Sequence, residues 1–235
     1  MNLGEITVQT TGENGLILRA KYIDEGLHRQ LLQKFNGGVE EKSFDSIGPT
    51  VGKELTNKTF IFIILVLFAI VFFIAFAFRG ASQPVSSWQY GLVAAGVAFN
   101  HDVLIPLGVF SFLGKFYNIQ VTIPIAVGLL TILGYSVHDT IVVFDRIREN
   151  ISRHSGQDFE TIVNKSLNQT LVRSVNTSLT TLLALLAIFF VGGETLKYFS
   201  LILILGIATG TYSSIFIASP ILVSWLRLTH SLKNA

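Results

Sequence analysis

Long apolar runs dominate the chain after residue 58 and predict transmembrane helices. The first run, Phe60 to Phe78, has nineteen consecutive residues without a polar side chain, and about 20 apolar residues form a helix that crosses a bilayer. Four further runs contain scattered polar residues, which are expected to face protein or water: 87–113, 119–144, 171–191 and 196–222. The pattern predicts an α-helical membrane protein with a five-helix transmembrane bundle over residues 59–235.

The first 58 residues have a different pattern. Residues 5–23 alternate between apolar and polar side chains around a Gly-Glu-Asn-Gly turn, which predicts a β-hairpin. The apolar residues that follow recur on one side of a helix: Leu27, Leu31, Leu32 and Phe35. We therefore predict a small α+β segment over residues 1–58.

This segment is small for an independent domain, because two strands and one helix bury little apolar surface. It also has no signal peptide or preceding span to carry it across a membrane. Both points predict that the natural start of the protein lies upstream of Met1. The alternative is a short N-terminal tail that crosses the membrane unaided.

The composition supports the membrane class and excludes others. Hydrophobic residues make up 50% of the chain and charged residues 14%, whereas about 25% of an average soluble domain is charged. The chain has no cysteine, which rules out disulfides, thiolate nucleophiles and cysteine-bound metals. A net charge of +2 without a long basic run does not predict nucleic-acid binding.

The distribution of lysine and arginine predicts the orientation in the membrane, because short loops rich in these residues stay cytoplasmic. The third loop, residues 145–170, carries four of them: Arg146, Arg148, Arg153 and Lys165. The second and fourth loops offer one each, Lys115 and Lys197. With five spans the termini lie on opposite sides. We therefore predict that the third loop and the C-terminus are cytoplasmic and that residues 1–58 are outside.

Three ionisable residues within the predicted spans are the main functional candidates. Asp102 lies near the middle of the second span, where a charge costs about 2.5–3.5 kcal/mol on insertion scales. Asp139 lies about one and a half turns from the cytoplasmic edge of the third span, and Arg173 opens the fourth. Residues this costly are expected to have a function or a buried partner.

Polar residues form stripes at helical spacing on two of the spans. The fourth span has Arg173, Thr177, Thr180, Thr181 and Ala184. The third span has Thr131, Tyr135, Asp139 or its neighbour His138, and Val142. Because such stripes avoid lipid, we predict that they face each other and that Asp139 and Arg173 lie within salt-bridge or single-water reach.

Each of these residues also has a structural interpretation. Arg173 is near enough to the interface to extend its charge into water, Asp139 could be its buried partner, and Asp102 could be a protonated buried acid. His101 and His138 each precede an aspartate, and neighbouring residues on a helix point about 100° apart, so neither pair is expected to line one narrow path. Two such pairs do not predict a metal site, which needs three or four convergent ligands.

Two further patterns predict helix packing. Gly206 and Gly210 form a Gly-x-x-x-Gly pair in the last span, a spacing that favours close approach of two helices. Asp145, Arg148 and Glu149 follow at helical spacing after the third span and predict interfacial ion pairs.

Five motifs follow one another along the chain: FDSIGPTVGKEL, FNHDV, GYSVHDTIVVFDRIREN, LVRSVNTSLTTLL and GTYSSIFIASP. They resemble motifs of SecF, the smaller subunit of the bacterial SecDF protein-export complex, in the resistance-nodulation-division superfamily. The resemblance implies six spans with an extracytoplasmic domain between the first two. This chain would supply five of the spans and the later part of that domain, in agreement with a start that lies upstream.

The resemblance implies a function in protein export across the bacterial inner membrane. SecF works with SecD to draw preprotein from the SecYEG translocon on the outer face, driven by the proton gradient, and YajC is a further implied partner. In this interpretation Asp139 and Arg173 form a switch, because the arginine competes with the proton for the carboxylate. The further relay and auxiliary residues are Asp102, His138, His101 and Thr177. Neither a covalent reaction nor a cofactor is implied, so the chain is not expected to be an enzyme.

Two departures and two alternatives accompany this interpretation. The family has asparagine where this chain has His138, and some relatives carry a carboxylate near Lys197 and Tyr198, a role that Glu194 could take.

The chain is a non-conducting assembly subunit if its buried acids are purely structural. It is half of a small-molecule exporter if it has an outward substrate cleft, but no large outward domain is visible in the sequence.

Overall fold

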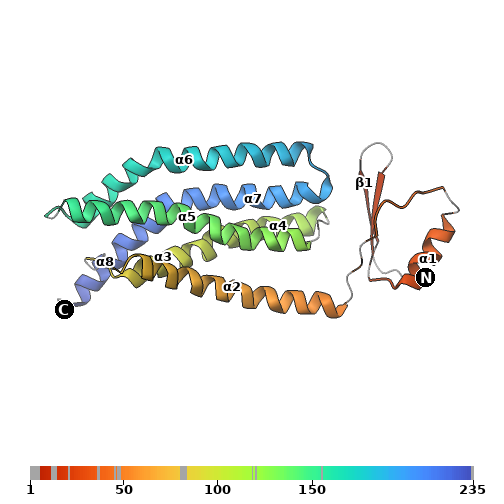
Figure 1. The fold of residues 1–235 in the computed structure, drawn as a ribbon, viewed down its shortest axis with the longest axis horizontal. Coiled ribbons are helices and arrows are strands. Elements are labelled where there is room, and N and C mark those ends of the chain that lie inside the picture. Colours follow the sequence, from red (N-terminus) through yellow and green to blue (C-terminus); the bar gives the residue numbers. More distant parts are fainter. Residues whose placement is uncertain are drawn as a thin grey trace. The chain divides into compact units, whose positions relative to one another are not determined.

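The computed structural model divides the chain into two compact units, Met1–Phe62 and Ile63–Ala235. Figure 1 shows the strands and helices of both units. The described residues are 6–11, 15–20, 22–35, 38–44, 46, 49–79, 84–117, 119, 121–154 and 156–233.

The first unit contains the predicted hairpin and helix. Strands β1 (Thr7–Thr11) and β2 (Gly15–Arg19) pair in antiparallel orientation. Helix α1 (Glu25–Lys34) begins after Asp24, whose carboxylate accepts a hydrogen bond from the Leu27 backbone N–H at 2.8 Å. Both elements confirm what the apolar pattern predicted. The domain boundary and the outward position of this segment stay predictions.

The second unit is a bundle of long helices that run side by side in Figure 1. Three of its helices are regular: α2 (Pro49–Ala77), which begins in the first unit, α5 (Ile123–Arg153) and α6 (Phe159–Val191). Two further segments each contain a π-helical turn. They are α3 (Ser87–Val97), η1 (Ala98–Val103) and α4 (Leu104–Tyr117), and α7 (Glu194–Ser213), η2 (Ser214–Ala218) and α8 (Ser219–Lys233).

Four helices in the described part of the chain are long and apolar enough to cross a membrane: Ser87–Tyr117, Ile123–Arg153, Phe159–Val191 and Leu196–Thr229. They confirm the helical membrane class, and they overlap the second to fifth predicted spans, which stay predictions. The predicted first span lies in α2, whose described apolar stretch, Ile61–Ala77, is shorter than these four. The total of five spans therefore stays a prediction.

Most of residues 145–170, the segment between the third and fourth predicted spans, is helical. α5 continues to Arg153 and α6 begins at Phe159, which leaves a short connection. The two extensions bury Ile147, Ile162 and Val163. Most of their charged residues are exposed: Asp145, Arg148, Arg153, Glu160 and Lys165. The sequence interpretation ended each span at the first charges, although one-sided packing allows an amphipathic helix to continue beyond them.

α7 approaches α5 closely at the two glycines of the Gly-x-x-x-Gly pair. A Cβ added at Gly206 would lie 2.2 Å from Ile132 Cγ1, and one added at Gly210 would lie 3.0 Å from Ser136 Cβ. Both distances are below the 3.4 Å at which ordinary van der Waals contact begins. The absence of a side chain therefore allows the two backbones to pack this tightly. We call this contact the α5–α7 seam.

Candidate functional site

Asp139 lies where α5, α6 and α7 meet, and it is 3% exposed. Its Oδ2 accepts hydrogen bonds from Ser178 Oγ on α6 at 3.3 Å and from Thr211 Oγ1 on α7 at 3.2 Å. The two hydroxyl oxygens are also 2.5 Å apart, so either hydroxyl can donate its one proton to the other oxygen instead of to the carboxylate. α5 turns Asp139 into the bundle because it shares a buried face with Ser136 and Val143, at spacings of three and four residues.

Asp102, in η1, is a second buried carboxylate, with 0% exposure. Its Oδ2 accepts hydrogen bonds from Ser136 Oγ on α5 and from Ser213 Oγ on α7, the latter at 2.7 Å. Its Oδ1 lies 2.7 Å from Nδ1 of His101, whose side chain is 24% exposed. The imidazole stacks on the exposed ring of Tyr212, with 6.0 Å between centroids. His101 therefore connects the buried carboxylate to the surface of the bundle.

The two carboxylates occupy neighbouring levels of the α5–α7 seam. Ser136 and Asp139 are three residues apart on α5, and Thr211 and Ser213 are two residues apart on α7. These separations correspond to about 4.5 Å and about 3 Å along the helix axes. Among the residues that the structure describes, no lysine or arginine forms an ion pair with Asp102 or Asp139.

π-helical turns frame the Asp102 site. Asp102 lies within η1, and Ser213 directly precedes η2. A π turn hydrogen-bonds from residue i to i+5, is rare and occurs frequently at functional sites. In this widened turn the side chains of His101 and Asp102 are in contact, and the expectation that the two cannot line one narrow path stays untested. On the regular helix α5, by contrast, His138 is exposed while Asp139 is buried.

Asp139 contacts hydroxyl groups and forms no direct ion pair with Arg173 among the described contacts, and the predicted salt-bridge or single-water reach of the two residues stays a prediction. Arg173 is exposed on α6 and lies five residues before Ser178, which is about 7.5 Å of helix rise. α6 buries a different row of residues: Ser166, Thr170, Ser174 and Ser178. Small side chains let helices approach closely in a membrane, so the serine row packs where the predicted row does not.

The predicted row of α6 is mostly on the surface. Thr177 and Thr180 are exposed, and Thr177 Oγ1 donates to the Arg173 backbone carbonyl at 2.9 Å. Thr181 is the member that meets the third-span row, through a 3.1 Å hydrogen bond from the Tyr135 hydroxyl. We call the exposed row of Arg173, Thr177 and Thr180 the α6 polar stripe.

Sequence reasoning identified both buried carboxylates but missed the hydroxyl groups that hold them: Ser136, Ser178, Thr211 and Ser213. A signal existed for one of these residues. Ser178 ends a row of hydroxyl residues spaced every four positions, starting at Ser166. For Ser136 and Thr211 the sequence has no comparable pattern, because their partners lie on other helices.

The chemistry available at this site is proton exchange. A serine or threonine hydroxyl can donate to a carboxylate or accept from a carboxylic acid, so the same partners fit both protonation states. In the described part of the chain, no group of three or more His, Cys, Asp or Glu residues could hold a metal ion. Glu194, the alternative carboxylate, lies outside the residues whose side chains are described.

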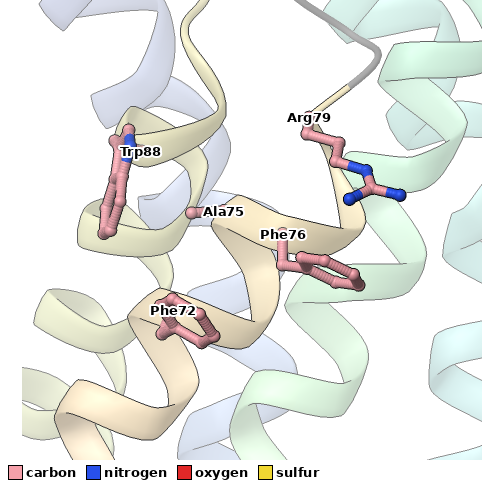
Figure 2. Close-up of a pocket in the computed structure, with 5 residues that line it drawn as sticks. All are labelled: Phe72, Ala75, Phe76, Arg79 and Trp88. Carbon is pink, nitrogen blue, oxygen red and sulfur yellow. The ribbon is translucent and has the colours of Figure 1, made fainter.

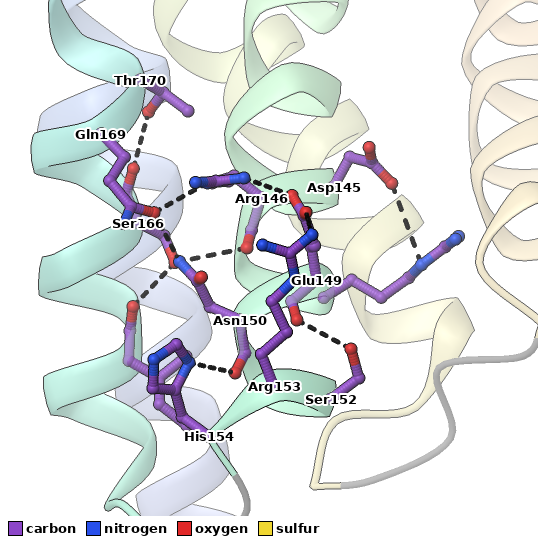
Figure 3. A network of polar contacts seen from close by, with 12 residues as sticks. Asp145, Arg146, Glu149, Asn150, Ser152, Arg153, His154, Ser166, Gln169 and Thr170 are labelled. Atoms are coloured by element: carbon purple, nitrogen blue, oxygen red, sulfur yellow. Dashed lines mark hydrogen bonds and ion pairs between the residues drawn. The ribbon is translucent and has the colours of Figure 1, made fainter.

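A separate polar network joins α5 and α6 toward the ends of these helices (Figure 3). Asn150 is buried and donates from Nδ2 to Ser166 Oγ and to Gln169 Oε1, both at 2.8 Å. Arg146 Nε donates to the same Gln169 oxygen at 2.7 Å, and its guanidinium pairs with Glu149. The network fixes the α5–α6 hairpin at a distance from the two carboxylates.

Two contacts bring segments that are far apart in sequence to the same end of the bundle. Arg148 on α5 donates to the Ala77 carbonyl at the end of α2, at 3.2 Å. Its predicted ion pair with Asp145 is long, at 3.8 Å, and exposed, so it contributes little stability. Arg227 on α8 pairs with Glu160 on α6. The end of α2, the α5–α6 hairpin and α8 therefore lie together.

Comparison with known proteins finds relatives over nearly the whole chain. Residues 28–228 match the family described as "Protein export membrane protein SecD/SecF, C-terminal". "Protein translocase subunit SecF" of Thermobaculum terrenum is 49% identical over 224 residues, which cover 93% of this chain and 69% of that protein. "Protein translocase subunit SecDF" of Thermus thermophilus is 42% identical over 181 residues, 77% of this chain and 23% of that protein.

The fold is similar to a solved structure as well. The crystal structure of SecDF from Thermus thermophilus, described as a translocon-associated membrane protein, matches with a TM-score of 0.77 and 35% sequence identity. The match covers 94% of this chain and 29% of the SecDF chain, so this chain spans less than a third of the length of that protein.

Proposed function

Because this chain belongs to the SecD/SecF family of protein-export membrane proteins, we propose that it acts as a SecF subunit that couples proton movement to late steps of preprotein export. Family membership and the four long apolar helices identify a multi-pass membrane protein with a role in protein export. In the proposed mechanism a proton binds to and leaves a buried carboxylate as helices move, without covalent catalysis.

The observation that carries this proposal is the pair of buried carboxylates in the α5–α7 seam. Among the described residues, Asp139 has hydroxyl partners alone, and Asp102 has hydroxyl partners and His101. An uncompensated charge in a bilayer is costly, whereas the protonated acid is neutral and can donate to the same hydroxyls. Such a site can accept and release a proton without rebuilding its contacts.

We propose that Arg173 provides the second state of the switch. In this conformation it is exposed, while hydroxyls hold Asp139. Loss of the proton would favour a shift or rotation of α6 that brings the guanidinium to the carboxylate. Helix ratchets of about one turn, or 5.4 Å, occur in known switches. This step is comparable with the rise of about 7.5 Å between Arg173 and Ser178.

The proton gradient supplies enough free energy for this movement. One elementary charge that crosses the membrane gains about 2.3 kcal/mol per 100 mV. A ligand shifts a conformational equilibrium by the difference between its affinities for the two states. The transfer of one or a few protons is therefore sufficient to alternate between conformations that differ by a few kcal/mol.

We propose a location in the bacterial inner membrane, with residues 145–170 and the C-terminus inside and residues 1–58 outside. The lysine and arginine distribution supports this orientation. The contacts of Arg148 with Ala77 and of Arg227 with Glu160 also support it. They bring together three segments that the orientation assigns to the cytoplasmic side.

We propose SecD as the direct partner, in line with the Thermus thermophilus relative, whose name is SecDF. The α6 polar stripe is exposed on a helix of membrane length, and polar groups at membrane depth face other helices or water rather than lipid. This stripe is the surface on which we expect a SecD helix to pack. SecYEG, YajC and the preprotein are further proposed partners.

Asp139→Asn tests the proposal, because asparagine is nearly isosteric and hydrogen-bonds but cannot exchange a proton. We expect gradient-driven export to be lost while the amount of folded protein in the membrane is unchanged. His138→Asn changes the exposed neighbouring residue and is expected to retain export. Normal export in Asp139→Asn would exclude Asp139 as the carrier and favour Asp102. Loss of export in proportion to lost protein would favour a non-conducting assembly subunit.

A further inference from the structure

A row of hydroxyl side chains runs inside the bundle from the α5–α6 hairpin to Asp139. Its members recur every four positions on α6 and are at most 7% exposed. We call them the α6 serine row: Ser166, Thr170, Ser174 and Ser178. At one end, Ser178 Oγ lies 3.3 Å from Asp139 Oδ2. At the other end, Ser166 Oγ accepts a hydrogen bond from Asn150 at 2.8 Å, in the network of Figure 3.

Ser174, in the middle of the row, has a buried hydroxyl without a partner. Among the described residues, no group hydrogen-bonds to its Oγ. Its neighbours in the row differ in this respect. Thr170 Oγ1 donates to the Ser166 carbonyl at 3.0 Å, and Ser166 Oγ donates to the Ile162 carbonyl at 2.7 Å. An unpaired buried hydroxyl is costly, and buried waters bond to polar groups that are otherwise unsatisfied. Ser174 is therefore suited to bind a water molecule.

The spacing of the row suits such a water. Side chains four residues apart on a helix have Cβ atoms about 5–6 Å apart. One water with two O–H···O hydrogen bonds, each about 2.7–2.8 Å long, spans a similar distance. A water beside Ser174 is thus within reach of the Thr170 hydroxyl on one side or the Ser178 hydroxyl on the other. Hydroxyls and water both donate and accept, so together they form a chain that can transfer a proton.

The α6 face changes character beyond Ser178. The next inward residues toward the other end of the helix are Leu182 and Leu185, which pack in the apolar core. The serine row therefore connects Asp139 to the hairpin end only. A surface cavity of about 200 Å³, shown in Figure 2, lies elsewhere, since none of its described lining residues belongs to α5, α6 or α7: Phe72, Ala75, Phe76, Arg79 and Trp88.

We propose that the α6 serine row, with a water bound at Ser174, carries the proton between Asp139 and the α5–α6 hairpin. This inference rests on the proposed function, in which Asp139 binds and releases the proton. At each step an oxygen accepts one proton and passes on the one that it held, so every hydroxyl and water keeps its composition. The proton lost by the Asp139 carboxylic acid is gained by water at the hairpin, which the proposed orientation places in the cytoplasm.

Hydrogen exchange of the Asp139 carboxyl group tests the row. The full chain in lipid vesicles is mixed rapidly with heavy water at a pH at which this carboxyl is protonated. Infrared spectroscopy follows its carbonyl stretch, which shifts when deuterium replaces the proton. The difference from Asp139→Asn assigns the band, because Asp102 can contribute one of its own. We expect Ser174→Ala to slow the exchange about fivefold, the factor that corresponds to one lost hydrogen bond.

A second variant and a control give the direction and the specificity. Thr170→Val removes the next hydroxyl toward the hairpin at nearly constant volume, and it is expected to slow the exchange by a similar factor. Ser200→Ala is the control, because Ser200 is equally buried but lies on α7, where its Oγ donates to the Lys197 carbonyl at 3.0 Å. It is expected to leave the exchange rate unchanged. Circular dichroism verifies the fold of each variant.

The results separate this inference from the proposed function. If Ser174 serves only in packing, alanine removes an unsatisfied hydroxyl, and the exchange rate stays that of the unmodified chain; this would overturn the path. An effect of Ser174→Ala that Thr170→Val does not share, or one that Ser200→Ala does share, would overturn it too. Thr170→Val decides if Ser174→Ala does not fold. Absence of the Asp139 band at every pH would instead refute Asp139 as the proton carrier, and with it the proposed function.

Discussion

Replacing Gly206 with alanine is expected to force α7 away from α5. The added Cβ would lie 2.2 Å from Cγ1, 2.3 Å from Cδ1 and 2.7 Å from Cγ2 of Ile132. The clash involves every branch of a β-branched side chain, which has one strongly preferred rotamer in a helix. A rotamer change therefore cannot relieve it, and the two backbones have to separate.

The size of the effect follows from these distances. The shortest one is 1.2 Å below ordinary contact (3.4 Å less 2.2 Å), so the cost lies near the upper end of the about 1–3 kcal/mol typical of overpacked cores. Alanine regains about 0.5–1 kcal/mol, because it is the better helix former. The expected net loss in the free energy of unfolding is about 2 kcal/mol.

Unfolding in mixed micelles with increasing dodecyl sulfate, followed by circular dichroism, measures this loss. Gly134→Ala on α5 is the matched control, because no atom lies within 4 Å of its added Cβ, and its stability is expected to be unchanged or slightly higher. Ile132→Ala removes the side chain that the added Cβ would meet, but it also creates a cavity of its own. The informative quantity is therefore the coupling energy of the double variant. Gly206→Ala is expected to cost less stability when Ile132 is already alanine. Equal stability of Gly206→Ala and Gly134→Ala would refute the close approach as a determinant of the seam.

Asp102→Asn is expected to lower gradient-driven export at unchanged protein level, and a wild-type export rate would exclude Asp102 from the relay. Cysteines that replace Gln30 and Ser152 are expected to react differently with a membrane-impermeant maleimide added outside. The cysteine at position 30 is expected to be labelled and the one at position 152 protected. The opposite pattern would reverse the orientation. Hydrogen bonds from the Thr161 hydroxyl and backbone N–H hold the pKa of Asp158 below its ordinary value. This carboxylate therefore stabilises the start of α6 above about pH 4, and the contribution is lost as the pH falls through the lower folded pKa. A carboxyl NMR titration with a midpoint at or above about 3.9 would contradict this.

The features that were predictable from the sequence depend on local patterns. The spans follow from apolar length, and the hairpin of residues 7–19 follows from alternation around a glycine-rich turn. Asp102 and Asp139 stood out because each interrupts an apolar run. Charged residues are a poorer guide to helix ends. The predicted spans end at the first charged residues, whereas α5 and α6 continue beyond them.

The contacts of the site were not predictable, because they depend on which helix faces meet. α6 carries two polar rows with the same spacing and an offset of one residue, one through Arg173 and Thr177 and the other through Ser174 and Ser178. Periodicity cannot choose between them. The choice follows from side-chain size at a close helix contact, and the sequence of one helix does not contain this information. The absence of the Asp139–Arg173 ion pair in this conformation follows from that choice.

The π turn in η1 also has a consequence for how this chain is aligned with other sequences. Each hydrogen-bonded ring of a π turn encloses one residue more than the corresponding ring of an α-helix. A relative whose second span is α-helical throughout therefore aligns with this chain only when a one-residue gap is placed inside the transmembrane helix. Insertions and deletions are normally tolerated in loops, so such a gap is easily dismissed as an alignment error. At residues 98–103 it would instead mark the evolutionary gain or loss of the turn that holds Asp102.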